Sequence, residues 1–132
     1  MTLFARDSQK VQVIGDEFHI PTSEISNLKF QISKCGHFDI VVNATPVGMK
    51  GPLENETLFT ADELEGVKFV YDLVVRTDDT PLVREAKKAN VPAIGGLEML
   101  LHQGAKQFEI WTGRVALIEM MREAALNRID RT

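Results

Sequence analysis

The chain has 132 residues, of which 44% are hydrophobic and 26% are charged, values typical of one globular domain with a core of its own. Its formal net charge of −4 argues against nucleic acid as a partner, because no basic stripe is present to pair with phosphates. The single cysteine, Cys35, excludes an internal disulfide, and no apolar run approaches the ~18 residues of a membrane span. We therefore expect a cytoplasmic protein with neither a membrane-spanning segment nor a secretion signal.

The first part of the chain predicts a strand followed by a helix. Residues 2–5 have the pattern of a short buried strand, and Asp7 or Ser8 is suited to cap the helix that follows. That helix would present three apolar side chains to a core, namely Val11, Ile14 and Phe18. Farther on, only Phe30 and Ile32 alternate, weakly, as in an edge strand.

The strongest strand signal lies at residues 39–44, where an apolar run ends in Asn43-Ala44-Thr45-Pro46. In open α/β sheets, ligands bind at the carboxyl ends of the strands. Small residues at such an end let a cofactor approach the backbone, and asparagine and threonine supply hydrogen-bonding groups. A strand followed by an ordinary turn explains the same residues, because asparagine, threonine and proline favour turns for local reasons.

The middle of the chain predicts a loop, a central strand and a helix. Residues 49–60 are rich in turn formers, and residues 68–75 are almost wholly apolar, as in a strand buried on both faces. Thr80 and Pro81 then begin a helix, as its cap and its first helical residue. Its buried face would consist of Leu82, Val83 and Ala86, and Asn90 suits its end.

Two more helices complete an alternating pattern. A short strand at residues 91–94 leads into a helix with a clear helical period, which is broken at residues 111–113. A last helix over residues 115–126 is apolar on most of its circumference, so we expect it to be covered. Alternating strands and helices indicate an α/β, Rossmann-like three-layer sandwich with a mostly parallel sheet. The glycine-rich dinucleotide fingerprint is absent, because no two glycines stand two positions apart.

Five short segments occur in the order that they have in one enzyme family. They are NATPVGM (43–49), DLV (72–74), TPL (80–82), GLEMLLHQG (96–104) and FEIWTG (108–113). Together they resemble the carboxyl half of the NADP-binding domain of shikimate dehydrogenase. The resemblance implies that residues 1–113 form a truncated Rossmann-like domain that lacks its first strand. It also implies that residues 114–132 contain a helix that packs against the rest of the intact enzyme.

The resemblance implies an NADP site. Arg6 matches the arginine that holds the 2′-phosphate in the family, although Ala5 and Asp7 depart from the usual neighbours. A planar guanidinium binds phosphate with paired hydrogen bonds. Taken without the family, Arg6 is a solvated charge at the end of a strand. The other implied cofactor-binding residues are Asn43, Ala44, Thr45, Pro46, Met49, Gly96 and Met99.

The resemblance also implies one substrate-binding residue. Gln103 follows Met99 by four positions, hence on the same helix face, and would reach the hydroxyl groups of shikimate. A solvent-facing glutamine is the competing interpretation. The family's tyrosine after the central strand is replaced by Val75, followed by Arg76. A solvated loop arginine is the favoured interpretation of Arg76, and contact with a substrate carboxylate is the alternative. Trp111 is expected in the core.

The predicted function is that of a C-terminal NADP-binding fragment of shikimate dehydrogenase, which reduces 3-dehydroshikimate to shikimate in aromatic amino acid biosynthesis. We expect no catalytic residue here, because the family's lysine and aspartate lie in a substrate domain that precedes this region, and we expect the fragment alone to be inactive. No metal site is expected, because the histidines lack ligand spacing.

The alternatives are a non-catalytic interaction fragment or pseudoenzyme, a quinate dehydrogenase fragment, and the NADP domain of glutamyl-tRNA reductase, which the acidic charge disfavours. An unpaired sheet edge favours a homo-oligomer.

Overall fold

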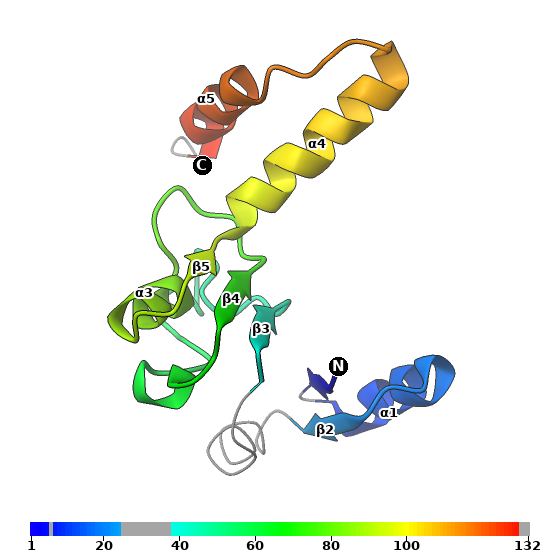
Figure 1. The fold of residues 1–132 in the computed structure, drawn as a ribbon, viewed down its shortest axis with the longest axis vertical. Coiled ribbons are helices and arrows are strands. Elements are labelled where there is room, and N and C mark those ends of the chain that lie inside the picture. The colour runs from blue at the N-terminus through cyan, green and yellow to red at the C-terminus, as the bar shows by residue number, and fades with distance from the viewer. Residues whose placement is uncertain (6, 25–37, 130–132) are drawn as a thin grey trace. The chain divides into compact units, whose positions relative to one another are not determined.

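The computed structural model describes residues 1–5, 7–24 and 38–129 (Figure 1). The chain forms two compact units, Met1–Phe38 and Asp39–Thr132, and each is described by itself. The predicted edge strand around Phe30 and Ile32 lies outside the described residues. None of the helices in the described parts is both long and apolar enough to cross a membrane.

The first unit is a strand–helix–strand motif. Strand β1 (Leu3–Ala5) pairs in parallel with β2 (Thr22–Glu24), and helix α1 (Ser8–Phe18) connects them. Asp7 caps α1, because its Oδ1 accepts a hydrogen bond from the backbone N–H of Lys10 at 3.1 Å. The predicted strand, cap and helix are therefore confirmed, whereas β2 was not predicted from the sequence. Its three residues are too few to show an alternating pattern.

Helix α1 and strand β2 approach each other closely at Gly15. A Cβ atom built on Gly15 would lie 2.2 Å from Cγ2 of Thr22, so only glycine fits at this contact. Of the predicted apolar face, Val11 is buried, but Ile14 and Phe18 are 44% and 62% exposed. The prediction of a wholly buried face is wrong for these two residues, because a sheet of two three-residue strands covers only part of an 11-residue helix.

The second unit is built on a three-stranded parallel sheet in the order β3-β4-β5. Its strands are β3 (Ile40–Asn43), β4 (Phe69–Asp72) and β5 (Ala93–Ile94), with the short 3₁₀ helix η2 (Asp62–Leu64) between β3 and β4. Strand β4 is central, as its apolar sequence predicts. The α/β class and the parallel sheet are thus as expected from the sequence. Parallel pairing brings the carboxyl ends of all three strands to one edge of the sheet.

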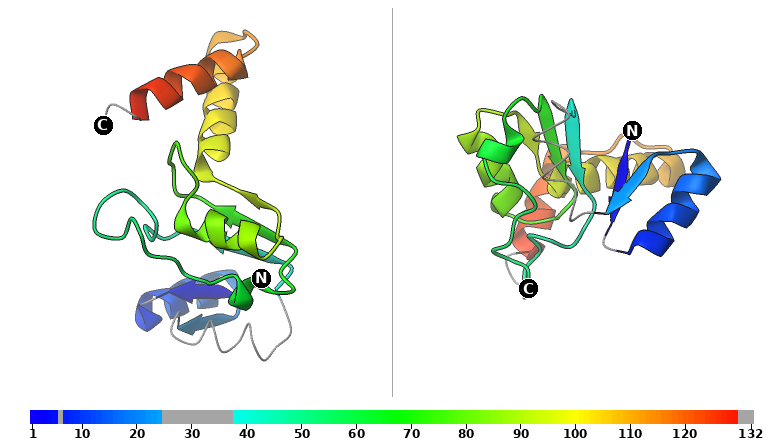
Figure 2. Two further views of the ribbon diagram at one scale, coloured as in Figure 1. Left: turned by 90° about the vertical axis from the view of Figure 1, so that its left-hand side faces the viewer. Right: turned by 90° about the horizontal axis from the view of Figure 1, so that it is seen from below.

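Helix α3 (Pro81–Lys88) lies across one face of this sheet (Figure 2). Thr80 caps it, since its Oγ1 accepts a hydrogen bond from the backbone N–H of Val83 at 3.2 Å. The predicted buried face is confirmed at Leu82, Val83 and Ala86. Asn90, with φ of 57°, takes the left-handed conformation just after the helix, as its residue type allows.

Helix α4 (Gly96–Thr112) starts at the carboxyl end of β5 and runs away from the sheet (Figure 1), and α5 (Ile118–Ile129) follows it. The break at residues 111–113 is confirmed, with Gly113 in the left-handed conformation at φ of 67°. Helix α5 begins three residues later than predicted and buries none of its residues. Trp111 is 78% exposed, so its expected place in the core is wrong. Several side chains in the last turns of α4 are exposed, among them Ile110, at 69%.

Candidate functional site

The carboxyl edge of the second sheet is held together by a buried polar network. Asn43 ends β3 and Asp72 ends β4, and the two residues are direct register partners. Their side chains are almost completely buried, and Asn43 Nδ2 donates to Asp72 Oδ1 at 2.9 Å. Thr80 Oγ1 donates to the other carboxylate oxygen of Asp72 at 2.5 Å. The network therefore joins the ends of β3 and β4 to the start of α3.

Asn43 also shapes the chain that leaves β3. Its Oδ1 accepts hydrogen bonds from the N–H and the hydroxyl of Thr45, at 2.9 and 2.7 Å. Its Nδ2 donates to the carbonyl oxygen of Val47 at 3.1 Å. The Asn43 amide thus has its hydrogen-bonding groups engaged by the protein itself. Ala44 and Pro46, in contrast, are exposed at this edge.

The segment that follows, residues 44–54, is called the β3 loop below. It turns at Gly48, whose φ of +91° favours glycine, and the Gly48 N–H donates to the carbonyl oxygen of Leu53 at 2.9 Å. A Cβ on Gly48 would lie 3.4 Å from Cδ of Pro81, so the loop is in contact with the start of α3. Met49 follows this turn and is 48% exposed. The loop thus presents small or flexible side chains next to a fixed backbone.

Arg76, just after β4, is buried and fully engaged. Its side chain is only 7% exposed, and its Nη1 donates to the carbonyl oxygens of Gly48 and Glu54 at 3.0 and 3.2 Å. Its Nε and Nη2 donate to the two carboxylate oxygens of Asp78 at 2.8 and 2.7 Å. The prediction of a solvated loop arginine is therefore wrong, because carbonyls and carboxylates converge on the guanidinium from two loops.

Electrostatics at this point follow from the same contacts. The hydrogen bond from Arg76 lowers the pKa of the Asp78 carboxyl, and the charge of the guanidinium acts in the same direction. The hydrogen bond to Asp78 raises the pKa of Arg76, opposed by burial and supported by the charges of Asp78 and Glu54. Both groups are therefore held in their charged forms.

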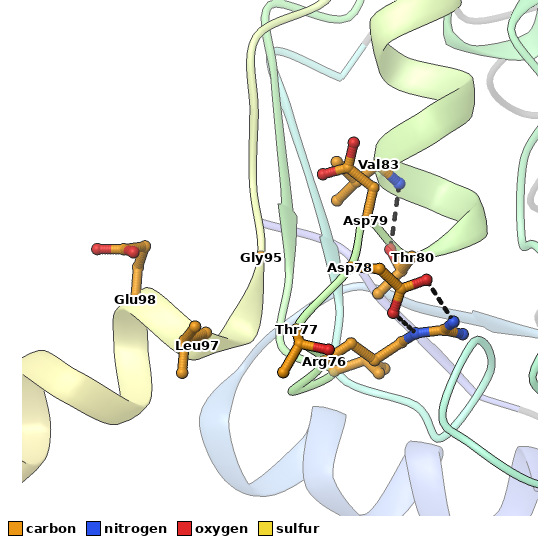
Figure 3. Close-up of a pocket in the computed structure, with 10 residues that line it drawn as sticks. Arg76, Thr77, Asp78, Asp79, Thr80, Val83, Gly95, Leu97 and Glu98 are labelled. Carbon is orange, nitrogen blue, oxygen red and sulfur yellow. Dashed lines mark hydrogen bonds and ion pairs between the residues drawn. The ribbon is translucent and has the colours of Figure 1, made fainter. Parts of the chain in front are cut away.

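A pocket of about 130 Å³ lies between the loop after β4 and the start of α4 (Figure 3). In Figure 3, Gly95, Leu97 and Glu98 lie on one side of it, and the loop residues lie on the other. The pocket is lined by Val74, Arg76, Thr77, Asp78, Asp79, Thr80, Val83, Gly95, Leu97 and Glu98. None of the predicted cofactor or substrate residues lines it, although Gly96 stands between two residues that do.

Gly96, the first residue of α4, packs directly against the end of β4. A Cβ atom built on it would lie 2.3 Å from the carbonyl oxygen of Leu73, and its N–H donates to the carbonyl oxygen of Val74 at 3.2 Å. The sequence predicts a glycine here for access to a cofactor. The structure provides another reason, because any side chain would separate α4 from the sheet.

Helix α4 places its predicted site residues one and two turns from the sheet edge. Met99 is half-buried, and Gln103, on the same face, is exposed. Glu98 forms a two-bond ion pair with Arg122 of α5, in which Nη2 lies 3.0 Å from Oε2. The hydrogen bond from Arg122 lowers the pKa of Glu98. This pair joins the two helices at the end of α4 nearest the sheet.

The structure brings most of the predicted cofactor residues to one edge of one sheet. Asn43 to Pro46 and Gly96 lie at the carboxyl ends of β3 and β5, whereas Arg6 lies outside the described residues. Sequence reasoning missed Arg76 as part of this edge. The local sequence shows only the two aspartates that follow Arg76 closely, Asp78 and Asp79. It does not show that the other partners of Arg76, Gly48 and Glu54, lie 28 and 22 residues earlier in the chain. In the described parts of the chain, no group of three potential metal ligands occurs.

Comparisons with known proteins point to one family. The family model of the shikimate 5′-dehydrogenase C-terminal domain matches residues 96–126. A shikimate dehydrogenase (NADP(+)) of Archaeoglobus fulgidus is 47% identical over 115 residues, which are 87% of this chain and 40% of that protein. The corresponding protein of Methanocaldococcus jannaschii is 42% identical over 93 residues, 70% of this chain and 33% of that protein. The chain thus spans less than half the length of these relatives.

Solved structures show the same relationship. A crystal structure of shikimate dehydrogenase in complex with NADP+ matches with a TM-score of 0.77 and 32% identity, over 97% of this chain and 46% of that one. A shikimate 5-dehydrogenase from Listeria monocytogenes, in complex with shikimate and NAD, matches with a TM-score of 0.73 and 30% identity, over 94% and 46%. A quinate dehydrogenase from Corynebacterium glutamicum, in complex with NAD, has a TM-score of 0.79 and 25% identity, over 96% and 45%.

Proposed function

This chain belongs to the shikimate dehydrogenase family, of which it matches the C-terminal part, and we propose that it forms the cofactor-binding side of an NADP-dependent shikimate dehydrogenase. The observation that carries the proposal is the carboxyl edge of the β3-β4-β5 sheet. A buried network fixes the strand ends there and leaves Ala44 and Pro46 exposed. Parallel sheets bind nucleotides at this edge.

The residues at this edge fit a dinucleotide by shape and chemistry. Ala44 and Pro46 are small and exposed, so a ligand can approach the backbone beside them. We assign Thr45 and Pro46 to the wall beside the nicotinamide ribose, and Met49, Gly96 and Met99 to the nicotinamide end. Arg6 is assigned to the 2′-phosphate. When bound, NADPH supplies the hydride that reduces the substrate carbonyl, and the chain's own residues bind and orient it.

The proposed substrate is 3-dehydroshikimate, with shikimate as the product. Gln103, exposed on the same face of α4 as Met99, is assigned to the hydroxyl groups of the substrate. Shikimate is proposed as the product because the relatives at 47% and 42% identity are shikimate dehydrogenases. We expect the 132 residues alone to lack activity, since the assigned residues bind and orient but none of them transfers a proton. The net charge of −4, without a basic stripe to pair with phosphates, favours small-molecule partners over nucleic acid.

The chain is also proposed to associate with itself. Strand β3 is an edge strand, and in the described part of the sheet only β4 pairs with it. Two of its side chains, Ile40 and Val42, are 58% and 54% exposed. Edge strands with exposed apolar residues favour pairing with another chain. This association is compatible with the cofactor-binding role, because the strand ends stay accessible.

Binding of the cofactor tests the proposed function directly. We expect calorimetric titration of the chain to detect weak NADPH binding, because the glycine-rich phosphate-binding fingerprint is absent, and still weaker binding of NADH, because only NADPH carries the 2′-phosphate. Replacing Arg6 with alanine should remove this preference through loss of the paired phosphate hydrogen bonds. The exposed Arg114 offers a matched control, since Arg114→Ala removes the same charge elsewhere.

Two outcomes would contradict the assignment. Absence of NADPH binding to the unmodified chain would show that the carboxyl edge does not hold a nucleotide. Equal binding by the Arg6→Ala and Arg114→Ala variants would show that the 2′-phosphate is held elsewhere.

A further inference from the structure

We propose that Arg76 is a positioning residue: its buried guanidinium holds the β3 loop against the loop that follows β4, and so sets the position of the nicotinamide end of the site. The inference rests on the proposed function and goes beyond it, because Arg76 is not among the residues assigned to cofactor or substrate. It concerns a residue that stands where the sequence departs from the family pattern.

The guanidinium nitrogens of Arg76 are all engaged within the protein. Each of its three nitrogen atoms donates a hydrogen bond to another residue, with carbonyl or carboxylate oxygens as acceptors. A charged side chain that is only 7% exposed is costly unless it is paired in this way. A guanidinium with its donors engaged is a poor candidate for a substrate carboxylate. The structure therefore favours a role within the protein over direct contact with a ligand.

The contacts of Arg76 connect the β3 loop to the loop that follows β4. Two acceptors, the carbonyl oxygens of Gly48 and Glu54, belong to the β3 loop, at 3.0 and 3.2 Å from Nη1. Glu54 adds a carboxylate contact at 3.4 Å. The other acceptor, Asp78, belongs to the loop after β4, which lines the pocket beside the start of α4 (Figure 3). One side chain thus joins two walls at the carboxyl edge of the sheet.

In the described parts of the chain, the β3 loop beyond Gly48 has few backbone hydrogen bonds to other segments. Its first residues are fixed by Asn43, through Thr45 and Val47. Beyond Gly48, the backbone hydrogen bonds are turns within the segment itself, such as the bond from Glu54 N–H to the carbonyl oxygen of Gly51 at 3.1 Å. Arg76 links this part of the loop to the residues that follow β4. The Met49 N–H donates to the carbonyl oxygen of Pro46 at 3.1 Å, and Met49 follows directly after one of the anchored carbonyls, so Arg76 adds to the contacts that set its position.

Two variants separate this role from a general loss of stability. Arg76→Gln removes the charge and most donors, and Arg76→Lys keeps the charge but not the planar fork, so it should restore the link only in part. If Arg76→Gln does not fold, Asp78→Asn weakens the same link from its exposed side and replaces it in the experiment. Arg114→Gln is the control, since it removes an exposed arginine in the same unit.

Amide hydrogen exchange gives the first measurement. In Arg76→Gln, the amides of Gly48 and Glu54 should exchange about tenfold faster or more, because hydrogen bonds to charged groups are among the stronger ones. The amides of β4 and α3 should keep their protection. Arg76→Lys should be intermediate, and Arg114→Gln should match the unmodified chain. Unchanged exchange in the β3 loop, or equal acceleration in β4 and α3, would overturn the proposal.

Two ligands give the second measurement. NADPH contains the nicotinamide, and 2′,5′-ADP contains only the adenosine and its phosphates, so the pair separates the two ends of the site. Arg76→Gln should weaken NADPH binding about tenfold and leave 2′,5′-ADP binding within about twofold, in line with the loss of a loop anchor. Equal loss for both ligands, or no loss for either, would overturn the positioning role while the proposed function stands. If the unmodified chain binds neither ligand, the proposed function fails, and the nicotinamide role of Arg76 fails with it.

Discussion

At the scale of single residues, the carboxyl edge of the sheet depends on Asp72. It is completely buried, and it accepts hydrogen bonds from Asn43, Thr80 and the N–H of Val74. A buried carboxylate is stable only with such partners, so the three donors and the carboxylate require each other. The result is a rigid platform at the strand ends, which is what a cofactor site needs before any ligand binds.

Gly96 provides a stability prediction at this scale. Gly96→Ala should destabilise the chain by about 2 kcal/mol or more, because the new Cβ would meet the carbonyl oxygen of Leu73 at 2.3 Å and overpack the junction of α4 with β4. Urea unfolding followed by circular dichroism measures the difference. The control is Gly104→Ala, where a Cβ meets only the flexible end of Met121 at 3.4 Å. That change should be neutral or slightly stabilising, because alanine favours helix. Similar effects of the two substitutions would contradict the packing argument.

Asp78 provides a pH prediction. Its pKa is lower in the folded protein than in the unfolded chain, chiefly because Arg76 donates to it. Its contribution to stability is therefore fully present above the ordinary aspartate pKa of about 3.9 and is lost as the pH falls through the lowered value. Asp78→Asn should accordingly lower the unfolding temperature at pH 7 and have no effect in strong acid. A difference between the two proteins that is independent of pH would contradict this prediction.

At the scale of elements, α3 connects the platform to the rest of the unit. Its cap residue, Thr80, has two functions, since its hydroxyl accepts from the N–H of Val83 and donates to Asp72. The apolar face of α3 packs on β4 and β5. Helix α4 is different, because its first residue, Gly96, packs against the end of β4, and the ion pair of Glu98 with Arg122 joins α5 to it. The carboxyl ends of β3 and β4 are therefore held by more buried hydrogen bonds than α4 is.

Thr80 tests the double function of the cap. Thr80→Val keeps the shape but removes the hydroxyl, which leaves the α3 N-terminus uncapped and one oxygen of Asp72 without its donor. We expect a loss of about 2–4 kcal/mol, the sum of a missing cap and a buried unsatisfied group. Thr80→Ser retains the hydroxyl and should lose much less, as thermal unfolding of the two variants will show. A larger loss in Thr80→Ser than in Thr80→Val would mean that the methyl packing, and not the hydroxyl, matters at this position.

At the scale of the whole molecule, the surface of the second unit leaves much apolar area uncovered. Exposed side chains occur on the edge strand β3 and along α4 and α5, among them Ile40, Val42, Trp111, Leu117 and Met120. The family relationship covers less than half of each relative's length. An exposed area of this kind favours association, with a second copy in the case of the β3 edge.

Self-association can be tested at that edge. Light scattering should detect a dimer or larger species whose fraction rises with protein concentration. Val42→Lys should reduce that fraction, because a charged residue on an edge strand opposes pairing with another strand. Val13→Lys is the control, since Val13 is also exposed, at 66%, but lies on α1 of the other unit. A monomer at every concentration would contradict the proposed association.

Local patterns in the sequence were sufficient where the physics is local. The start of α3 follows from Thr80 and Pro81, because a cap and an N-terminal proline act within one helical turn. The central place of β4 follows from its apolar residues, and the strand end at Asn43 from a run of turn formers. The five family segments, in order, then pointed to the C-terminal part of the shikimate dehydrogenase family. Strand β2 was not predicted, because its three residues are too few to show the alternation of apolar and polar residues typical of a strand.

Only the tertiary structure decided which residues serve the edge of the sheet. Arg76 was expected in solvent but is buried, because its acceptors Gly48 and Glu54 lie 28 and 22 residues earlier in the chain. Gly96 suggested access for a ligand, but the contact that requires glycine there is with the backbone of Leu73. Trp111 was expected in the core but is 78% exposed. Residue type and spacing determine the class of fold and the kind of site, whereas burial and long-range hydrogen bonds exist only once distant segments have been brought together.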